Sequence, residues 1–232
     1  MQEPGNRGIL ALVAERALAF VPEQGTVGLG TGRAATAFVE ALARLPQARL
    51  RNLRCVPTSE TTAALARSLG LELTTLVDAE RVDVTVDGAD EVAPHLDSTK
   101  PHPPPSLQQN LPPPTSHRVV IVATEDKLVQ RLGARGKLPV EVVPFAWPFC
   151  QRRLKQLLGR EPVLRRNGND PYTSDGENYI LDCPVGPIEN ASELELAIRA
   201  IPGVVGTGLF LDLADVVLVG EGNQVRELRR RR

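Results

Sequence analysis

Short apolar runs rich in β-branched residues alternate with helical patterns along the first half of the chain, and this alternation constrains the fold most. Five such runs are typical of strands: TVGLG (26–30), LRCVPT (53–58), LELTTL (71–76), VDVTVDGAD (82–90) and RVVIVAT (118–124). Apolar residues at helical spacing cover residues 9–20, 35–45 and 59–70, with Ser59 suited to an N-cap and Gly70 to a helix end. Strands separated by helices form a parallel sheet covered on both faces. We therefore expect an α/β protein with a Rossmann-like parallel sheet.

The order of elements changes after Gly133. Strand patterns cover residues 139–145, 161–166, 178–185 and 204–210, and helical patterns cover 146–159 and 191–201. Their sequence is β-α-β-β-α-β, the arrangement of a ferredoxin-like unit. We expect a smaller ferredoxin-like α+β domain at 133–206, inserted before a last strand, ADVVLVG (214–220), that returns to the first sheet. The Rossmann-like domain then covers 1–132 and is completed by 207–232.

Composition and charge exclude several classes of function. Acidic and basic residues are interspersed and the net charge is -1, so no broad basic surface makes nucleic acid a default partner. We expect the terminal RELRRRR (226–232) to be a solvated, frayed tail. No run reaches the roughly 18 apolar residues of a membrane span. Cys55, Cys150 and Cys183 lack the spacing of a metal site, which predicts reduced, half-buried thiols in a cytosolic protein.

The stretch GLGTGRAATAF (28–38) is a candidate phosphate loop. A strand that ends in glycines and opens into a helix directs backbone N–H groups at an anion. Arg33 stands where a dinucleotide fingerprint requires glycine, and Thr26 and Val27 stand where a methyltransferase usually carries an acidic residue. A tight turn that needs only small residues explains the loop equally well.

Charged residues follow two of the predicted central strands. VTVDGADEVAP places Asp87 and Asp90 at a carboxyl strand end, where crowding of two carboxylates raises the pKa of one so that it can act as an acid. Aspartates that cap a turn would explain the pair by itself, but beside a phosphate-type loop we favour a ligand site. Lys100 lies ten residues past Asp90, and Lys127 follows the strand at 118–124. Single lysines are usually solvated, but beside an anion loop they would bind a phosphate or an enediolate.

Six stretches in order resemble the A-type ribose-5-phosphate isomerase family: VGLGTG, VPTSETT, VDGADEV, PVEVVPFAW, SDGENYILDC and IPGVVGTGLF. The resemblance covers residues 8 to 220, and DGADE and IPGVVGTGLF are more distinctive than the glycine loop. It implies interconversion of D-ribose 5-phosphate and D-ribulose 5-phosphate in the non-oxidative pentose phosphate pathway. It also implies a small sugar-phosphate substrate, no metal and no cofactor, and a cytoplasmic homo-oligomer, either dimer or tetramer.

The resemblance also assigns roles to individual residues. It implies that Thr31 and Gly32 bind substrate, that Asp87 assists opening of the furanose ring, and that Lys127 helps to hold the substrate. Gly88, Ala89 and Asp90 would belong to the same binding turn as Asp87. Lys100 would stabilise the charge of the enediolate, so that Asp87, Asp90 and Lys100 form the catalytic set. Moving a proton from C2 to C1 needs a base, an electrophile for the oxyanion and a clamp on the phosphate.

Two departures from the family pattern stand out. Arg33 and Ala34 replace the two hydroxyl residues of the family's G-T-G-S-T loop, and Arg33 could still pair with phosphate. After Lys100 the family has K-G-G-G-G-A-L-x-x-E-K, whereas residues 101–117 contain seven prolines and no Asp, Glu, Lys or Arg. In that register Gln109 occupies the position of the catalytic glutamate and cannot act as a carboxylate base. Losing a positioned base typically costs on the order of 10² to 10⁴ in rate.

The proline-rich window therefore has three explanations. A misread or out-of-frame coding stretch comes first, because the resemblance ends abruptly while the length is preserved. A natural divergence and a proline-rich ligand for an aromatic groove are the others. Two functions follow: the isomerase, or a non-catalytic sugar-phosphate-binding protein of the same fold. Translation of residues 100–118 in every frame tests the first explanation, which fails if no glycine-rich, glutamate-containing stretch is found.

Overall fold

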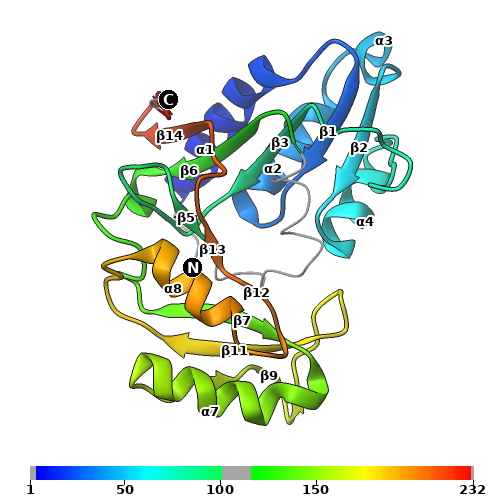
Figure 1. Cartoon of the computed structure of the whole chain (residues 1–232). Helices are drawn as coiled ribbons and strands as arrows, with labels where there is room; N and C mark the ends of the chain where they lie inside the picture. Colours follow the sequence, from blue (N-terminus) through cyan, green and yellow to red (C-terminus); the bar gives the residue numbers. More distant parts are fainter. Residues whose placement is uncertain (1–3, 101–115, 231–232) are drawn as a thin grey trace. The chain divides into compact units, whose positions relative to one another are not determined.

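The computed structural model describes residues 4–100 and 116–230 and contains two compact units (Figure 1). The first unit comprises residues 4–89, 116–127 and 213–230, and the second comprises 90–100 and 128–212. The predicted domains differ from these units at residues 90–100, 128–132 and 207–212, which belong to the second unit. The reason is a small sheet in which residues 91–92 and 98–99 pair, and 98–99 also pair with 209–210. Gln109 lies outside the described residues.

The first unit is built on a six-stranded sheet in the order β15-β14-β6-β3-β1-β2. The strands are β1 (Gly25–Leu29), β2 (Leu53–Pro57), β3 (Val84–Gly88), β6 (Val119–Thr124), β14 (Val216–Glu221) and β15 (Gln224–Arg229). All neighbours pair in parallel except β14 and β15, which form an antiparallel hairpin at the edge. This order confirms the Rossmann-like parallel sheet and the return of residues 214–220 to it.

Helices pack on this sheet and bury their apolar faces against its apolar strands. They are α1 (Pro4–Ala17), α2 (Arg33–Ala43), α3 (Gln47–Leu50) and α4 (Glu60–Ser68), with a 3₁₀ turn η1 (Leu18–Phe20). Val13 of α1 and Phe38 and Leu42 of α2 pack with Leu29 and Val86 of the sheet in one buried cluster. The predicted ends of α4 are confirmed, since Ser59 Oγ accepts a hydrogen bond from Thr62 N–H (3.1 Å) and Gly70 has φ +75°.

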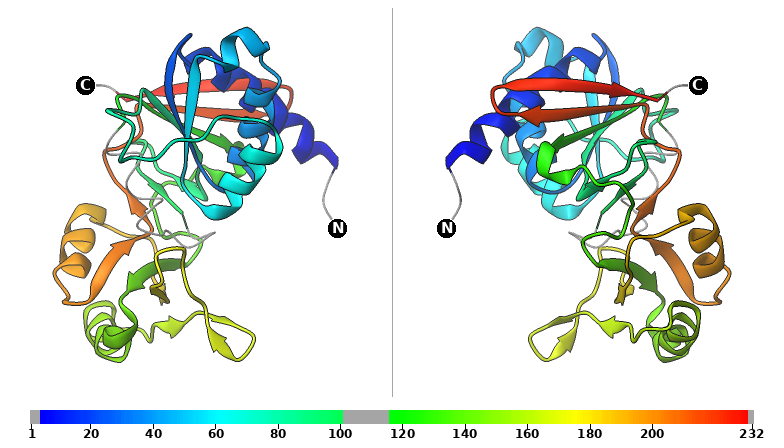
Figure 2. Two further views of the ribbon diagram at one scale, coloured as in Figure 1. Left: turned by 90° about the vertical axis from the view of Figure 1, so that its right-hand side faces the viewer. Right: turned by 90° about the vertical axis from the view of Figure 1, so that its left-hand side faces the viewer.

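Two predictions about the first unit are wrong. Residues 71–76 form no strand, because the chain bonds to β2 only around Cys55 before a turn held by Thr75 and Asp78. Residues 226–229 are not a frayed tail, because β15 pairs with β14 along its whole length (Figure 2). The Glu227 side chain also forms ion pairs with Arg16 and Arg229.

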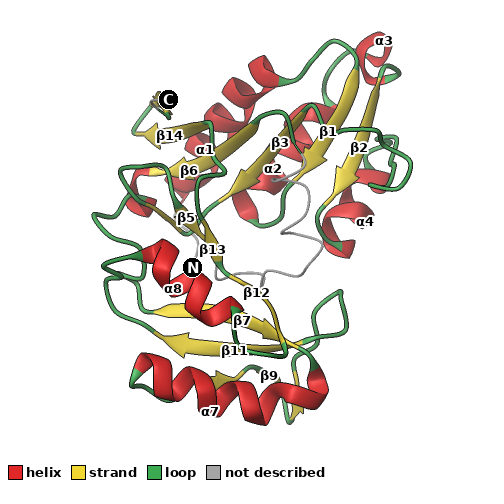
Figure 3. Ribbon diagram, in the orientation of Figure 1, coloured by secondary structure: helices red, strands yellow, loops and turns green. Residues whose placement is uncertain are grey.

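The second unit contains a four-stranded antiparallel sheet in the order β12-β7-β11-β8 (Figure 3). Its elements are β7 (Lys137–Val142), α7 (Trp147–Leu158), β8 (Val163–Leu164), β11 (Tyr179–Pro184), α8 (Ala191–Arg199) and β12 (Val204–Thr207), with η3 (Pro144–Ala146) before α7 and a hairpin of β9 (Arg166–Asn167) and β10 (Asp170–Pro171). Leu154 of α7 and Ile198 of α8 pack with Val140 and Leu181 of this sheet. Order and direction are those of the predicted ferredoxin-like unit.

A three-stranded antiparallel sheet completes the second unit in the order β13-β5-β4. It contains β4 (Glu91–Val92), β5 (Ser98–Thr99) and β13 (Leu209–Phe210). The sequence predicted one strand at 204–210, but the structure divides it at Gly208 between two sheets. A side chain at Gly208 would lie 2.8 Å from Pro139, so only glycine fits where the chain changes sheet.

The three cysteines are free thiols, as predicted, but they are fully buried and not half-buried. Burial raises the pKa of Cys55 to about 12, since a thiolate would lose its hydration. Across the described ranges, no helix combines the length and the apolar character that crossing a membrane requires.

Candidate functional site

The glycine loop of the first unit is shaped by side chains of the neighbouring strand. A Cβ at Gly28 would lie 2.1 Å from Thr85 Oγ1, and a Cβ at Gly30 would lie 2.2 Å from Asp87 Oδ1 and 2.5 Å from Asp87 Cα. Positions 28 and 30 therefore leave no room for a side chain, because the β3 residues Thr85 and Asp87 lie directly against the backbone there. The need for small residues, which the sequence analysis gave equal weight with a phosphate loop, is real at these two positions.

Asp87 fixes the loop that follows β1. Its side chain is fully buried, and Oδ1 accepts hydrogen bonds from the backbone N–H groups of Thr31 (3.1 Å) and Gly88 (2.7 Å). Gly30 N–H donates to Val86 O (2.9 Å), which extends the β1–β3 ladder to the start of the loop. The carboxyl ends of β1 and β3 are thus joined by a carboxylate, at the edge where open parallel sheets bind ligands.

The Thr31 hydroxyl points into a cluster of hydroxyl groups. Thr31 Oγ1 lies 2.8 Å from Thr58 Oγ1, 2.9 Å from Ser59 Oγ and 3.1 Å from Thr62 Oγ1. Thr62 Oγ1 also donates to Gly30 O (3.0 Å). A hydroxyl has one proton, so Thr31 Oγ1 donates to Ser59 Oγ and accepts from Thr58 Oγ1, because the Thr62 proton is used on Gly30 O. Thr31 therefore holds the loop through its side chain and leaves backbone groups to face a ligand.

Gly32 begins the helix that follows the loop. It is the N-cap of α2 with φ +100°, a backbone conformation that favours glycine, and no side chain caps the helix there. The first N–H groups of an α-helix have no partner within it and attract anions. Arg33 is exposed at the first helical position, next to these N–H groups.

Lys127 ends the turn η2 (Glu125–Lys127), directly after β6. Its side chain is 19% exposed, and its Nζ lies 3.7 Å from Asp126 Oδ2. Asp126 also accepts a hydrogen bond from Thr124 Oγ1. Because β6 pairs with β3, the first unit brings Lys127 to the same sheet edge as Asp87, Gly88 and Ala89.

The other two predicted site residues, Asp90 and Lys100, belong to the second unit and its three-stranded sheet. Asp90 N–H donates to Thr99 O (2.9 Å), and Lys100 N–H donates to Gly208 O (3.0 Å). The Lys100 side chain is buried, and its Nζ lies over the ring of Phe210, 4.9 Å from the centroid. Burial lowers the pKa of Lys100 to about 7, because the ammonium loses hydration.

Comparison with known proteins covers nearly the whole chain. The family model of ribose 5-phosphate isomerase A (phosphoriboisomerase A) matches residues 54–224. The ribose-5-phosphate isomerase A of Roseiflexus sp. (strain RS-1) is 45% identical over 217 residues, which cover 93% of each chain. This chain belongs to the ribose-5-phosphate isomerase A family.

Two solved structures support the same family assignment. The ribose 5-phosphate isomerase A of Methanocaldococcus jannaschii superposes with a TM-score of 0.88 at 33% identity and covers 97% of this chain and 99% of that one. A D-ribose-5-phosphate isomerase in complex with phospho-erythronic acid gives a TM-score of 0.91 at 30% identity, over 96% and 98% of the two chains. The resemblance that the sequence indicated is confirmed.

Sequence reasoning missed residues that hold the site in place. Thr58, Ser59 and Thr62 carry the hydroxyl groups around Thr31, and the motif TSETT was the available signal. Glu91 was also missed, although it belongs to the DGADE stretch. Its buried carboxylate accepts hydrogen bonds from the N–H groups of residues 133 and 135 (2.6 Å each) and so ties β4 to the loop before β7.

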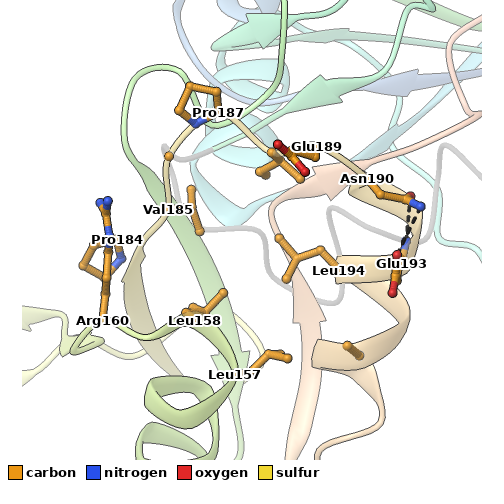
Figure 4. A pocket seen from close by; sticks show the side chains of 13 residues that line it. Leu157, Leu158, Arg160, Pro184, Val185, Pro187, Glu189, Asn190, Glu193 and Leu194 are labelled. Atoms are coloured by element: carbon orange, nitrogen blue, oxygen red, sulfur yellow. Dashed lines mark hydrogen bonds between the residues drawn. The ribbon is translucent and has the colours of Figure 1, made fainter.

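A pocket of about 660 Å³ lies elsewhere in the second unit and contains none of the predicted site residues (Figure 4). Leu157, Leu158 and Leu194 give it apolar walls, and Arg160 lies across from Glu193. Within residues 4–100 and 116–230, no group of three His, Cys, Asp or Glu side chains is placed to hold a metal ion.

Proposed function

We propose that this chain interconverts D-ribose 5-phosphate and D-ribulose 5-phosphate through an enediolate, as a step of the non-oxidative pentose phosphate pathway. The observation that carries the proposal is the family match over residues 54–224, which includes Asp87, Asp90, Lys100 and Lys127. The reaction is an aldose-ketose isomerisation, in which a base takes the proton from C2 and returns it to C1. Gln109 occupies the position of that base, so we expect turnover of the wild-type chain to be lower than that of Gln109→Glu by on the order of 10² to 10⁴.

The loop of the first unit binds the substrate in this proposal. Backbone N–H groups at Gly32 and the start of α2 attract the phosphate, and Lys127 holds the same anion. Asp87 assists opening of the furanose ring, with Gly88 and Ala89 in the same turn. The support is the placement of these residues at the carboxyl ends of β1, β3 and β6, with the Asp87 carboxylate bonded to the loop.

Lys100 stabilises the enediolate, and Asp90 belongs to the same catalytic set. Burial lowers the pKa of Lys100 to about 7, so the side chain can gain or lose a proton near neutral pH. A buried ammonium interacts more strongly with an oxyanion than a solvated one, because little water screens the charge. The ammonium also carries a proton that it can share with the developing oxyanion.

Gln109 is the sequence feature that favours a non-catalytic sugar-phosphate-binding protein. An amide cannot take the C2 proton as a carboxylate does. The relatives do not support this alternative, since they carry the name of the enzyme. We expect Gln109→Glu to raise kcat by about 10² to 10⁴, the usual contribution of a positioned base.

The test is an isomerisation assay on the purified chain beside the variants Gln109→Glu and Lys100→Met. Wild-type turnover of ribose 5-phosphate above the background rate, lost in Lys100→Met, supports the proposal. Saturable binding of ribose 5-phosphate by the wild-type chain without turnover contradicts it and favours the binding protein. Titration calorimetry with ribose 5-phosphate measures that binding independently of turnover.

The same proposal includes a cytoplasmic homo-oligomer, dimer or tetramer, that needs no metal or cofactor. Three buried free thiols support a reducing compartment, where cysteines stay unpaired. Light scattering after size-exclusion chromatography measures the oligomeric state, and a mass equal to one chain of 25.1 kDa contradicts the oligomer.

A further inference from the structure

The surroundings of Lys100 are set by the pairing of three short strands. Phe210 pairs with Ser98 and Leu209 pairs with Thr99, and the hydrogen bond from Lys100 to Gly208 continues this ladder by one residue. Side chains alternate along a strand, so Phe210 stands on the same face as position 208, opposite Lys100. Because residue 208 is glycine, no side chain separates the lysine from the ring.

The Phe210 ring is buried and lies under the ammonium. It is 4% exposed, and Lys100 is 5% exposed. The Nζ-to-centroid distance of 4.9 Å is within the 6 Å over which the negative face of an aromatic ring attracts a cation. Such an attraction is stronger where the cation has lost water.

We propose that Phe210 is a positioning residue for Lys100, whose ammonium it holds in place and keeps charged through a cation–π contact in the absence of substrate. Phe210 acts through Lys100 and touches no reacting atom in this account. The catalytic consequence rests on the proposed function, whereas the contact itself is a property of the folded chain.

The effect of nearby carboxylates on the pKa of Lys100 must be distinguished from the effect of the Phe210 ring. Carboxylates on or next to the described strands around it include Asp90, Glu91, Asp97, Glu141 and Asp212. Three accept hydrogen bonds from other groups: Glu91 from the N–H groups of residues 133 and 135, Asp97 from the N–H group of Asp212, and Glu141 from Ser174 and Asn178. Asp90 directly precedes β4, so the ring series is repeated in an Asp90→Asn background to distinguish the effect of this carboxylate from that of the ring.

The test replaces Phe210 by 4-fluoro-, 3,5-difluoro- and 3,4,5-trifluorophenylalanine. Fluorine keeps the shape of the ring and progressively removes the negative charge of its face, so folding is preserved while the contact weakens. The chain contains four lysines, Lys100, Lys127, Lys137 and Lys155. NMR of ¹³Cε,¹⁵Nζ-lysine therefore gives four signals, and Lys100→Arg identifies the signal of interest. The same fluorination at Phe38, in the core of the first unit, is the matched control.

We expect the pKa of Lys100 to fall stepwise with each fluorine, by about half to one unit over the series, and to stay constant in the Phe38 series. The trend should persist in an Asp90→Asn background. A Lys100 pKa independent of ring fluorination overturns the proposal. The readout needs no substrate, so an inactive wild-type chain that shows the trend refutes the proposed function and leaves the role of Phe210 supported.

A kinetic readout follows from the same shift. Removing the cation–π contact destabilises the charged lysine, so the alkaline limb of kcat moves to lower pH. Above pH 8 the trifluoro variant should lose about three- to tenfold in kcat relative to the wild type, with little change below pH 6. An equal loss at every pH indicates a merely structural role and contradicts positioning through charge.

Discussion

Gly30→Ala is the substitution whose effect follows most directly from the geometry of the loop. The added Cβ would lie 2.5 Å from Asp87 Cα, whereas ordinary contact begins at 3.4 Å, so backbone must move by about 0.9 Å. Overpacking costs about 1–3 kcal/mol, and loss of the hydrogen bond from Gly30 to Val86 costs about 0.5–1.5 kcal/mol. We expect the free energy of unfolding to fall by about 2–4 kcal/mol.

The same displacement moves Asp87 and the Thr31 backbone, which are joined by a hydrogen bond. A misplacement of about 1 Å in a catalytic site can cost on the order of 10² in rate, so kcat/KM for ribose 5-phosphate should fall by about that factor. Urea unfolding and the isomerisation assay measure the two effects.

Gly8→Ala is the control for this substitution. Gly8 lies in α1 with nothing within 4 Å of an added Cβ, so alanine should stabilise the helix by about 0.5–1 kcal/mol and leave kcat/KM unchanged. A Gly30→Ala chain with wild-type activity and wild-type unfolding midpoint would refute the steric account of the loop.

Three further predictions concern pH, the hydroxyl cluster and metals. Burial lowers the pKa of Lys100 to about 7, and the proposed role requires the ammonium form, so kcat should decrease as pH rises through 7; a profile flat from pH 6 to 9 argues against that role. Thr31→Val removes the hydroxyl that donates to Ser59 Oγ and lies 2.8 Å from Thr58 Oγ1, and losing these part-buried hydrogen bonds should cost about 1–3 kcal/mol in unfolding free energy; an unchanged urea midpoint would contradict the cluster. Dialysis against EDTA should leave kcat unchanged, and recovery of activity on adding a divalent metal would disprove metal-free catalysis.

Much of the fold was predictable because its strands are apolar, β-branched and regularly separated by helices. The two wrong predictions in the first unit share a cause, because the local sequence does not determine which strand a segment pairs with. Residues 71–76 have a strand-like pattern but meet β2 only near Cys55. The charged strand β15 was missed because it covers a sheet edge, where charged residues are common.

Asp87 and Lys100 could be named as candidates from the sequence because carboxylates and amines are common acid-base groups, and their roles stay predictions. The supporting contacts of the candidate site were not predictable, because they join distant parts of the chain. Thr58 and Thr62 lie 27 and 31 residues from Thr31, and only the fold brings their hydroxyls together. Phe210 is 110 residues after Lys100, and the pairing of β5 with β13 places its ring under the ammonium.

The most direct test of the proposed activity follows the proton that moves. Ribose 5-phosphate deuterated at C2 is incubated with the wild-type chain in water, and ribulose 5-phosphate formation and loss of deuterium to solvent are measured together. We predict ketose formation above background with exchange of the C2 label, and loss of both in Lys100→Met. Saturable binding of the sugar phosphate with neither ketose nor exchange would contradict the isomerase.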